Sequence, residues 1–217
     1  MRKPLLLGGL AIAAGMAIVG WRISNRFAAE TFSETKAMPP EAAPLCPWRD
    51  PDSDLKKFFP GATEYRTDTR ILSGLRTELA ARLNRIPTGD ENALRVYRVY
   101  QGRVQIGTIL TRRVKGEYGA IELVLAVDTN QIVKGMTLQR LREPQQITEA
   151  LQDEAWQRAF RGKRVEDRWQ IGSDVPEVPA IAHRSAEAVL GGARDLLILL
   201  ATADRATTPQ VAQIHHR

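Results

Sequence analysis

Three polar residues stand at the start of the last long apolar stretch of the chain, in the sequence Ala182-His183-Arg184-Ser185. The stretch 182–203 has the leucine spacing of a helix. The first turn of a helix presents unpaired N–H groups and the positive end of the helix dipole, so it favours a phosphate. We therefore treat His183, Arg184 and Ser185 as candidate phosphate ligands.

Two of the polar residues also have other interpretations. His183 has the chemistry of a haem or metal ligand, but no carboxylate or second histidine stands at ligand spacing, which favours an ordinary surface or capping histidine. Glu143 has the chemistry of a general base, but nothing in the sequence pairs with it. No nucleophile elbow, phosphate-binding loop or dinucleotide fingerprint is present. The sequence therefore predicts no metal site and no catalytic residue.

The composition limits the classes of partner. The chain has 217 residues, enough for one globular domain with tails, and a net charge of +6. Its arginines are spread out, without a run of five basic residues, so we expect a solvated basic surface and no nucleic-acid partner. Cys46 is the only cysteine, which excludes an intrachain disulfide, a cysteine-based zinc site and an iron–sulfur cluster.

The first residues have the pattern of a membrane anchor. Residues 4–21 carry no charge and lie between Lys3 and Arg22, and roughly 20 such residues cross a bilayer core. No small-residue cleavage site follows directly, which favours an uncleaved anchor over residues 1–27, with a cleaved signal peptide as the alternative. Gly8 and Ala11 lie on a side of this helix built from small residues, a surface that suits a partner helix.

The charges around the anchor favour one orientation. Two basic residues flank each end, and the free N-terminal amine adds one charge to the leading end. We therefore expect a single-pass protein of the inner or cytoplasmic membrane, with its domain on the periplasmic or extracytoplasmic side. Its expected partners are the lipid bilayer and subunits of a membrane complex.

Behind the anchor the sequence predicts a proline-rich linker over 28–52, a domain over 53–204 and a flexible tail over 205–217. Within the domain, apolar spacing and turn residues predict helices and strands that form an α+β domain with a mainly antiparallel sheet. The predicted helices span 52–59, 69–85, 148–160 and 182–203, the predicted strands span 94–100, 104–110, 120–127 and 132–138, and 112–119 is a predicted loop.

The hairpin over 120–138 and its approach resemble the FMN-binding domain family. That family includes the periplasmic flavin subunits of the Rnf complex and of sodium-pumping NADH:quinone oxidoreductase. Tyr118-Gly119 stands where the family has a glycine–tyrosine–x–glycine entry, and Glu143-Pro144 stands where it has a Glu-Thr-Pro-Gly loop. Trp156, Phe160 and Gly162-Lys163 match the helix that follows. The resemblance spans residues 94–200 and implies an FMN-binding-domain-like fold.

The resemblance also implies a cofactor site and shows where this chain departs from it. FMN would lie between the hairpin and the last helix, and the implied contacts are Tyr118, Gly119, Glu143, Pro144, His183, Arg184 and Ser185. Family members attach FMN through a threonine in Ser-Gly-Ala-Thr-x-Thr-Ser, but here His183 replaces that threonine and Ile181 replaces the glycine. A histidine has no hydroxyl to form the phosphodiester, so any FMN would be bound noncovalently.

Two functional hypotheses follow from this departure. The first is a membrane-anchored electron-transfer protein that binds FMN and belongs to a membrane redox chain. The second is a flavin-free accessory subunit that keeps the fold as a docking surface beside a larger membrane complex. Both are non-catalytic.

Overall fold

The computed structural model describes residues 52–207, which form an α+β domain with a five-stranded antiparallel sheet. The predicted fold class and the mainly antiparallel sheet are thus confirmed. The elements are α2 (Asp52–Phe58), β1 (Glu64–Ile71), η1 (Ser73–Leu75), α3 (Arg76–Leu83), η2 (Gly89–Asn92), β2 (Ala93–Gln101), β3 (Val104–Lys115), β4 (Ala120–Val127), β5 (Val133–Leu141), α4 (Gln145–Gln152), α5 (Glu154–Arg158), η3 (Ala180–Ala182) and α6 (His183–Thr207).

The predicted anchor lies outside the described residues, as do nearly all of the predicted linker and most of the predicted tail. Between residues 52 and 207 there is no helix with the length and apolar character needed to cross a bilayer. The resemblance to an FMN-binding domain and the membrane topology therefore stay predictions.

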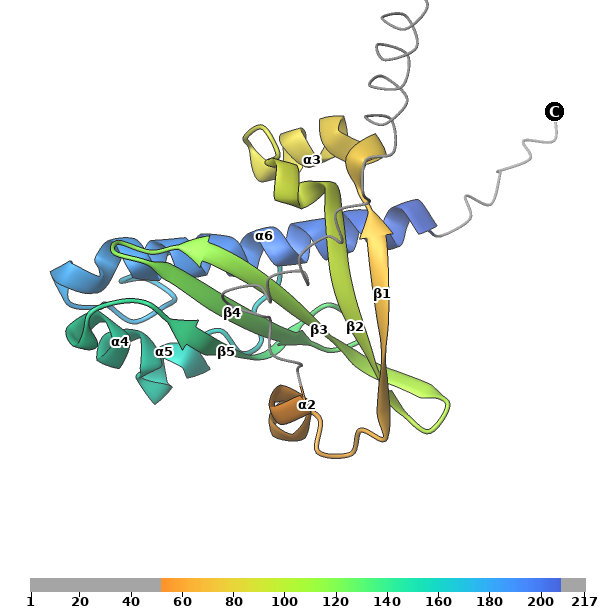
Figure 1. Cartoon of the computed structure of the whole chain (residues 1–217), viewed down its shortest axis with the longest axis horizontal. Helices are drawn as coiled ribbons and strands as arrows, with labels where there is room; N and C mark the ends of the chain where they lie inside the picture. The colour runs from red at the N-terminus through yellow and green to blue at the C-terminus, as the bar shows by residue number, and fades with distance from the viewer. Residues whose placement is uncertain (1–51, 208–217) are drawn as a thin grey trace, which may run out of the picture. The chain divides into compact units, whose positions relative to one another are not determined.

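The sheet is a meander in which each strand pairs with the next along the chain (Figure 1). Tyr97 of β2 pairs with Ile109 of β3, which pairs with Ala126 of β4. β4 is buried along nearly its whole length, because apolar groups cover both faces of the sheet. One face packs against α6 and α4 to form the main core, and the other packs against α2, which contributes Phe58.

The longest helix, α6, runs across one face of the sheet (Figure 1). About half of its 25 residues are buried, including the run from Leu196 to Leu200. A Cβ at Gly192 would overlap the side chain of Val114 in β3, so glycine allows the helix to approach the strand closely. The predicted helix over 182–203 is confirmed and extends to Thr207.

The predicted helix over 69–85 is wrong in its first half. β1 continues to Ile71, and the helix α3 begins only at Arg76. Leu72 and Leu79 fit one helical stripe in the sequence, but both belong to the main core from different elements. β1 carries charged residues with little burial, which is usual for an edge strand and hides the strand pattern.

The predicted loop over 112–119 is also wrong, because β3 continues to Lys115 and leaves only a short turn. Two neighbouring arginines make the end of the strand polar, and each of them has an acidic partner. Arg112 forms an ion pair with Glu91, and Arg113 forms one with Glu122 of β4. These charged residues hide the end of the strand from an apolar pattern.

The predicted helix over 148–160 is divided into α4 and α5. Asp153 leaves the helical conformation at φ −55° and ψ 130°, and its carboxylate accepts the N–H of Trp156 as an N-cap. Thr148 is not a helix start as predicted; its hydroxyl donates to the carbonyl of Glu143, and α4 begins right after Pro144.

Candidate functional site

The candidate cofactor residues come from three segments that are far apart in the sequence. Tyr118 and Gly119 lie in the turn between β3 and β4, Glu143 lies between β5 and α4, and Ser185 lies in the first turn of α6. The structure brings these three segments together through direct hydrogen bonds. We call this set, with Glu117, the Glu143 cluster.

The carboxylate of Glu143 accepts hydrogen bonds from the protein itself. The backbone N–H of Tyr118 donates to Oε2 at 3.1 Å, and that of Gly119 donates to Oε1 at 3.4 Å. The hydroxyl of Ser185 donates to Oε1 at 3.2 Å. The carboxylate thus fixes the turn between β3 and β4 against the start of α6.

Ser185 is fully buried and uses its hydroxyl in both directions. Its oxygen accepts the N–H of Glu117 at 2.8 Å while its proton goes to Glu143. A hydroxyl has a single donor, so this proton is no longer available to a ligand while the contact is kept.

Two glycines permit the close packing of the turn. A Cβ at Gly116 would overlap the carboxylate of Glu143, and a Cβ at Gly119 would overlap the backbone carbonyl of Arg142. Both positions therefore require glycine for reasons of space. The glycine at position 119 in the entry to the hairpin is thus explained by the close approach of the Arg142 carbonyl.

The other candidate residues lie at the margin of the cluster. The side chain of Tyr118 is 65% exposed, and only its backbone takes part. His183 is half-exposed, with Nδ1 3.6 Å from the carboxylate of Glu187 one turn later, so the prediction that no carboxylate stands at ligand spacing from His183 is wrong. Arg184 pairs with Glu117 at 3.3 Å. Pro144 supplies the residue before the first turn of α4. None of these side chains joins the bonds around Glu143.

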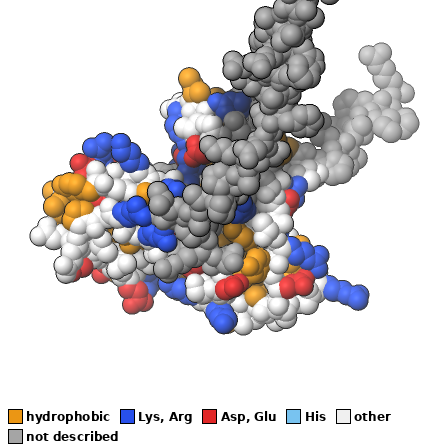
Figure 2. Space-filling view, in the orientation of Figure 1, with side chains coloured by type: hydrophobic (Ala, Val, Ile, Leu, Met, Phe, Trp, Pro, Cys, Tyr) orange, Lys and Arg blue, Asp and Glu red, His pale blue; other side chains and the backbone are white. Residues whose placement is uncertain are grey.

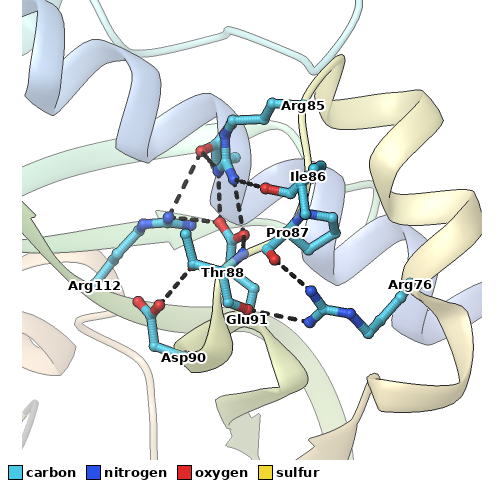
Figure 3. Close-up of polar contacts among 9 residues, drawn as sticks. Arg76, Arg85, Ile86, Pro87, Thr88, Asp90, Glu91 and Arg112 are labelled. Atoms are coloured by element: carbon cyan, nitrogen blue, oxygen red, sulfur yellow. Dashed lines mark hydrogen bonds and ion pairs between the residues drawn. The ribbon is translucent and has the colours of Figure 1, made fainter.

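The structure contains a second enclosed carboxylate, Glu91, which was not among the candidate residues predicted from the sequence (Figure 3). Its side chain accepts two hydrogen bonds from Arg85, at 2.6 and 2.9 Å, and one from Arg112 at 2.6 Å. The N–H of Thr88 donates to it at 2.7 Å, and Arg85 continues to Asp195 of α6. We call these five residues the Glu91 cluster.

The electrostatics of the Glu91 cluster favour the ionised carboxylate. Burial alone would raise its pKa, but the hydrogen bonds from Arg85 and Arg112 outweigh burial and lower the pKa of Glu91 to about 2. The hydrogen bond to Glu91 in turn raises the pKa of Arg85. The sequence signal was the capping box Thr88-x-x-Glu91, which the structure contains at the start of η2.

In both clusters the polar groups form hydrogen bonds and ion pairs with one another. Every contact described above joins one part of the protein to another, and residues 52–207 contain no group of three histidine, cysteine or acidic side chains that could hold a metal ion. A groove of about 620 Å³ lies apart from both clusters, between α2 and the start of β1, lined by Leu55, Phe59, Ala62 and Tyr65 among others.

Comparison with known proteins adds no family assignment. No protein-family model matches this chain. No curated protein matches it in sequence either.

Proposed function

We propose that this protein is a flavin-free accessory subunit of a membrane complex, with an FMN-binding-domain-like fold kept as a docking surface. It would be held by its N-terminal anchor and carry its domain on the periplasmic or extracytoplasmic side. The observation that supports a flavin-free site is the closed set of hydrogen bonds around Glu143.

The start of α6 supports the same proposal. The resemblance would put the flavin phosphate here, but His183 lacks the hydroxyl of the attachment threonine. The hydroxyl of Ser185, the nearest substitute, is buried and engaged by Glu117 and Glu143. Ile181 adds a bulky side chain, 44% exposed, where the family has glycine. A phosphate would have to displace internal bonds to bind here.

The membrane part of the proposal depends on the sequence. The uncharged stretch 4–21 has the length of an anchor, and its small residues, among them Gly8 and Ala11, suit close contact with another membrane helix. A subunit of this kind needs no catalytic residues, which agrees with the absence of a catalytic motif in the sequence.

A noncovalent FMN protein of a membrane electron-transfer chain is the second candidate. It is favoured by the convergence of Tyr118, Gly119, Glu143 and Ser185, which the resemblance assigns to the flavin site. The backbone N–H groups of the turn would then bind flavin instead of Glu143.

Native mass spectrometry of the detergent-extracted full chain tests the two candidates. We expect the mass of the chain with other membrane subunits and without FMN, and no binding when FMN is added during purification. One FMN per chain would contradict the flavin-free proposal. In that case Ser185→Ala should weaken FMN binding, whereas Arg103→Ala, at the exposed turn between β2 and β3, should leave it unchanged.

A further inference from the structure

A second groove lies between α2 and α5, on the side of the sheet edge formed by β5. Its volume is about 230 Å³. Its lining residues come from α2, β5, α5 and the turn after α5. They are Lys57, Phe58, Gly135, Met136, Glu154, Gln157, Arg158 and Arg161. We call it the cationic groove. It shares no residue with the Glu143 or Glu91 clusters.

The charge of this groove is strongly unbalanced. Lys57, Arg158 and Arg161 line it with a single carboxylate, Glu154, which is already paired with Arg158. Lys134 precedes Gly135 on β5 but does not line the groove, because its ammonium lies over the ring of Phe59, which lines the larger groove. Figure 2 shows basic and acidic side chains interspersed over this view of the molecule.

Two of the lining cations, Lys57 and Arg161, have no ion pair with an acidic side chain among residues 52–207. Lys57 lies over the ring of Phe58 at 5.3 Å, and Lys134 lies over the ring of Phe59 at 4.9 Å. Among residues 52–207, neither lysine nor Arg161 forms an ion pair. By contrast, Arg98 is paired with Asp204. The positive charge of the groove is thus left for a ligand to neutralise.

The floor of the groove is apolar and closely packed. Phe58 and Met136 are both buried, and a Cβ at Gly135 would overlap the ring of Phe58. An apolar floor lowers the local dielectric, which strengthens the attraction between the cations and an anion above it. Arginine presents parallel N–H donors that match the oxygens of a phosphate.

We propose that the cationic groove binds a phosphate-bearing anion, either a free phosphate ester or the headgroup of an anionic lipid. The shared chemistry is a phosphate held by Arg161 and Lys57, with Arg158 at the margin. The small volume suits a single headgroup rather than a folded partner. This site is independent of flavin binding at the Glu143 cluster.

The alternative explanation is that the cations only offset the negative ends of helix dipoles. Lys57 lies in the last turn of α2 and Arg158 in that of α5, where positive charge is favourable. That explanation does not cover Arg161, which lines the groove from beyond the end of α5. It predicts lower stability when the charges are removed, but no saturable anion binding.

Isothermal titration calorimetry on the detergent-solubilised full chain tests the proposal at constant ionic strength in chloride buffer. Inorganic phosphate is the first probe, and monomeric short-chain phosphatidylglycerol and phosphatidylcholine are the second and third. We expect saturable binding of phosphate or phosphatidylglycerol, and a rise in Kd of about tenfold for Arg161→Glu and Lys57→Glu. Arg161→Lys keeps the charge but not the parallel N–H donors, so its Kd should lie between those of wild type and Arg161→Glu.

Arg103→Glu is the matched control, because it makes the same charge change at an exposed turn. Tighter binding of phosphatidylglycerol than of inorganic phosphate would identify a lipid headgroup, and the reverse would identify a soluble ester. No saturable binding of either probe, or equal weakening by Arg103→Glu, would overturn the proposal. Unfolding curves of each variant show whether a loss of binding is a loss of fold.

Discussion

Glu91 and Glu143 are both enclosed carboxylates near β3, but different groups hold them. Glu91 is 2% exposed and bonded to one arginine after α3 and one in β3, whereas Glu143 is half-buried and bonded to backbone N–H groups and one serine. A carboxylate held by arginines joins separate elements through charge. A carboxylate held by N–H groups determines the shape of one turn. Substitution of Glu91 and of Glu143 should therefore differ in the loss of stability and in how much of the domain is affected.

The largest effect is expected at Glu91. In Glu91→Ala, the partly buried guanidinium of Arg112 loses its main partner, which should lower the free energy of unfolding by about 3 kcal/mol. Urea unfolding followed by circular dichroism measures the change. The control is Glu78→Ala, which removes the exposed ion pair with Arg205 and should cost less than about 1 kcal/mol. Equal losses in the two variants would contradict the distinction.

Acid should weaken the Glu91 cluster in the same direction but to a smaller extent. The pKa of Glu91 is about 2 in the folded protein, against an ordinary value of 4.5. Below pH 4.5 the unfolded chain therefore binds a proton that the folded chain does not bind. Its contribution to stability is complete above pH 4.5 and is lost as the pH falls through 4.5 toward 2. Unfolding midpoints across this range should fall more steeply for wild type than for Glu91→Gln.

Glu143→Ala should have a smaller and more local effect. The N–H groups of Tyr118 and Gly119 can turn to water when the carboxylate is removed, so we expect a loss of about 1–2 kcal/mol. Hydrogen–deuterium exchange should increase in the turn between β3 and β4, and in the first turn of α6, while exchange near Arg85 stays unchanged. Faster exchange throughout the sheet would show that Glu143 also joins distant elements.

The smallest effect is expected at the margin of the Glu143 cluster. Arg184 is 70% exposed in its side chain and pairs with Glu117, so Arg184→Ala should change the free energy of unfolding by no more than about 0.5 kcal/mol. The measurement is the same urea titration. A loss as large as that of Glu143→Ala would mean that the ion pair, rather than the carboxylate, holds the turn.

The sequence predicted best the elements with strong apolar periodicity. The hairpin over 120–138 and the helix over 182–203 follow from apolar residues that the structure buries, such as Leu125 and Leu196. The strand Glu64–Ile71 and the end of β3 were missed because their side chains are charged. Arg112 has the partner Glu91, 21 residues away, and no local pattern reveals such a pair.

The meeting of the three candidate segments could be predicted, but the hydrogen bonds between them could not, and their role as a cofactor site stays a prediction. Its three segments were recognised from the order of motifs that surround Tyr118, Glu143 and Ser185. That Glu143 accepts the N–H groups of the turn depends on the path of the backbone at Gly116 and Gly119, which residue types alone do not determine. The break between α4 and α5 at Asp153 could not be predicted from residue types either, because aspartate occurs both within helices and at their starts.

The strand order of the sheet also affects how the chain reaches its final structure. Because every strand pairs with its neighbour in sequence, the five strands can assemble by closing short loops. Their main apolar face, however, is covered by α6, the last described element. Until the ribosome has released His183–Thr207, a nascent chain exposes that apolar face. Packing of α6 onto the sheet therefore competes with aggregation of the incomplete domain.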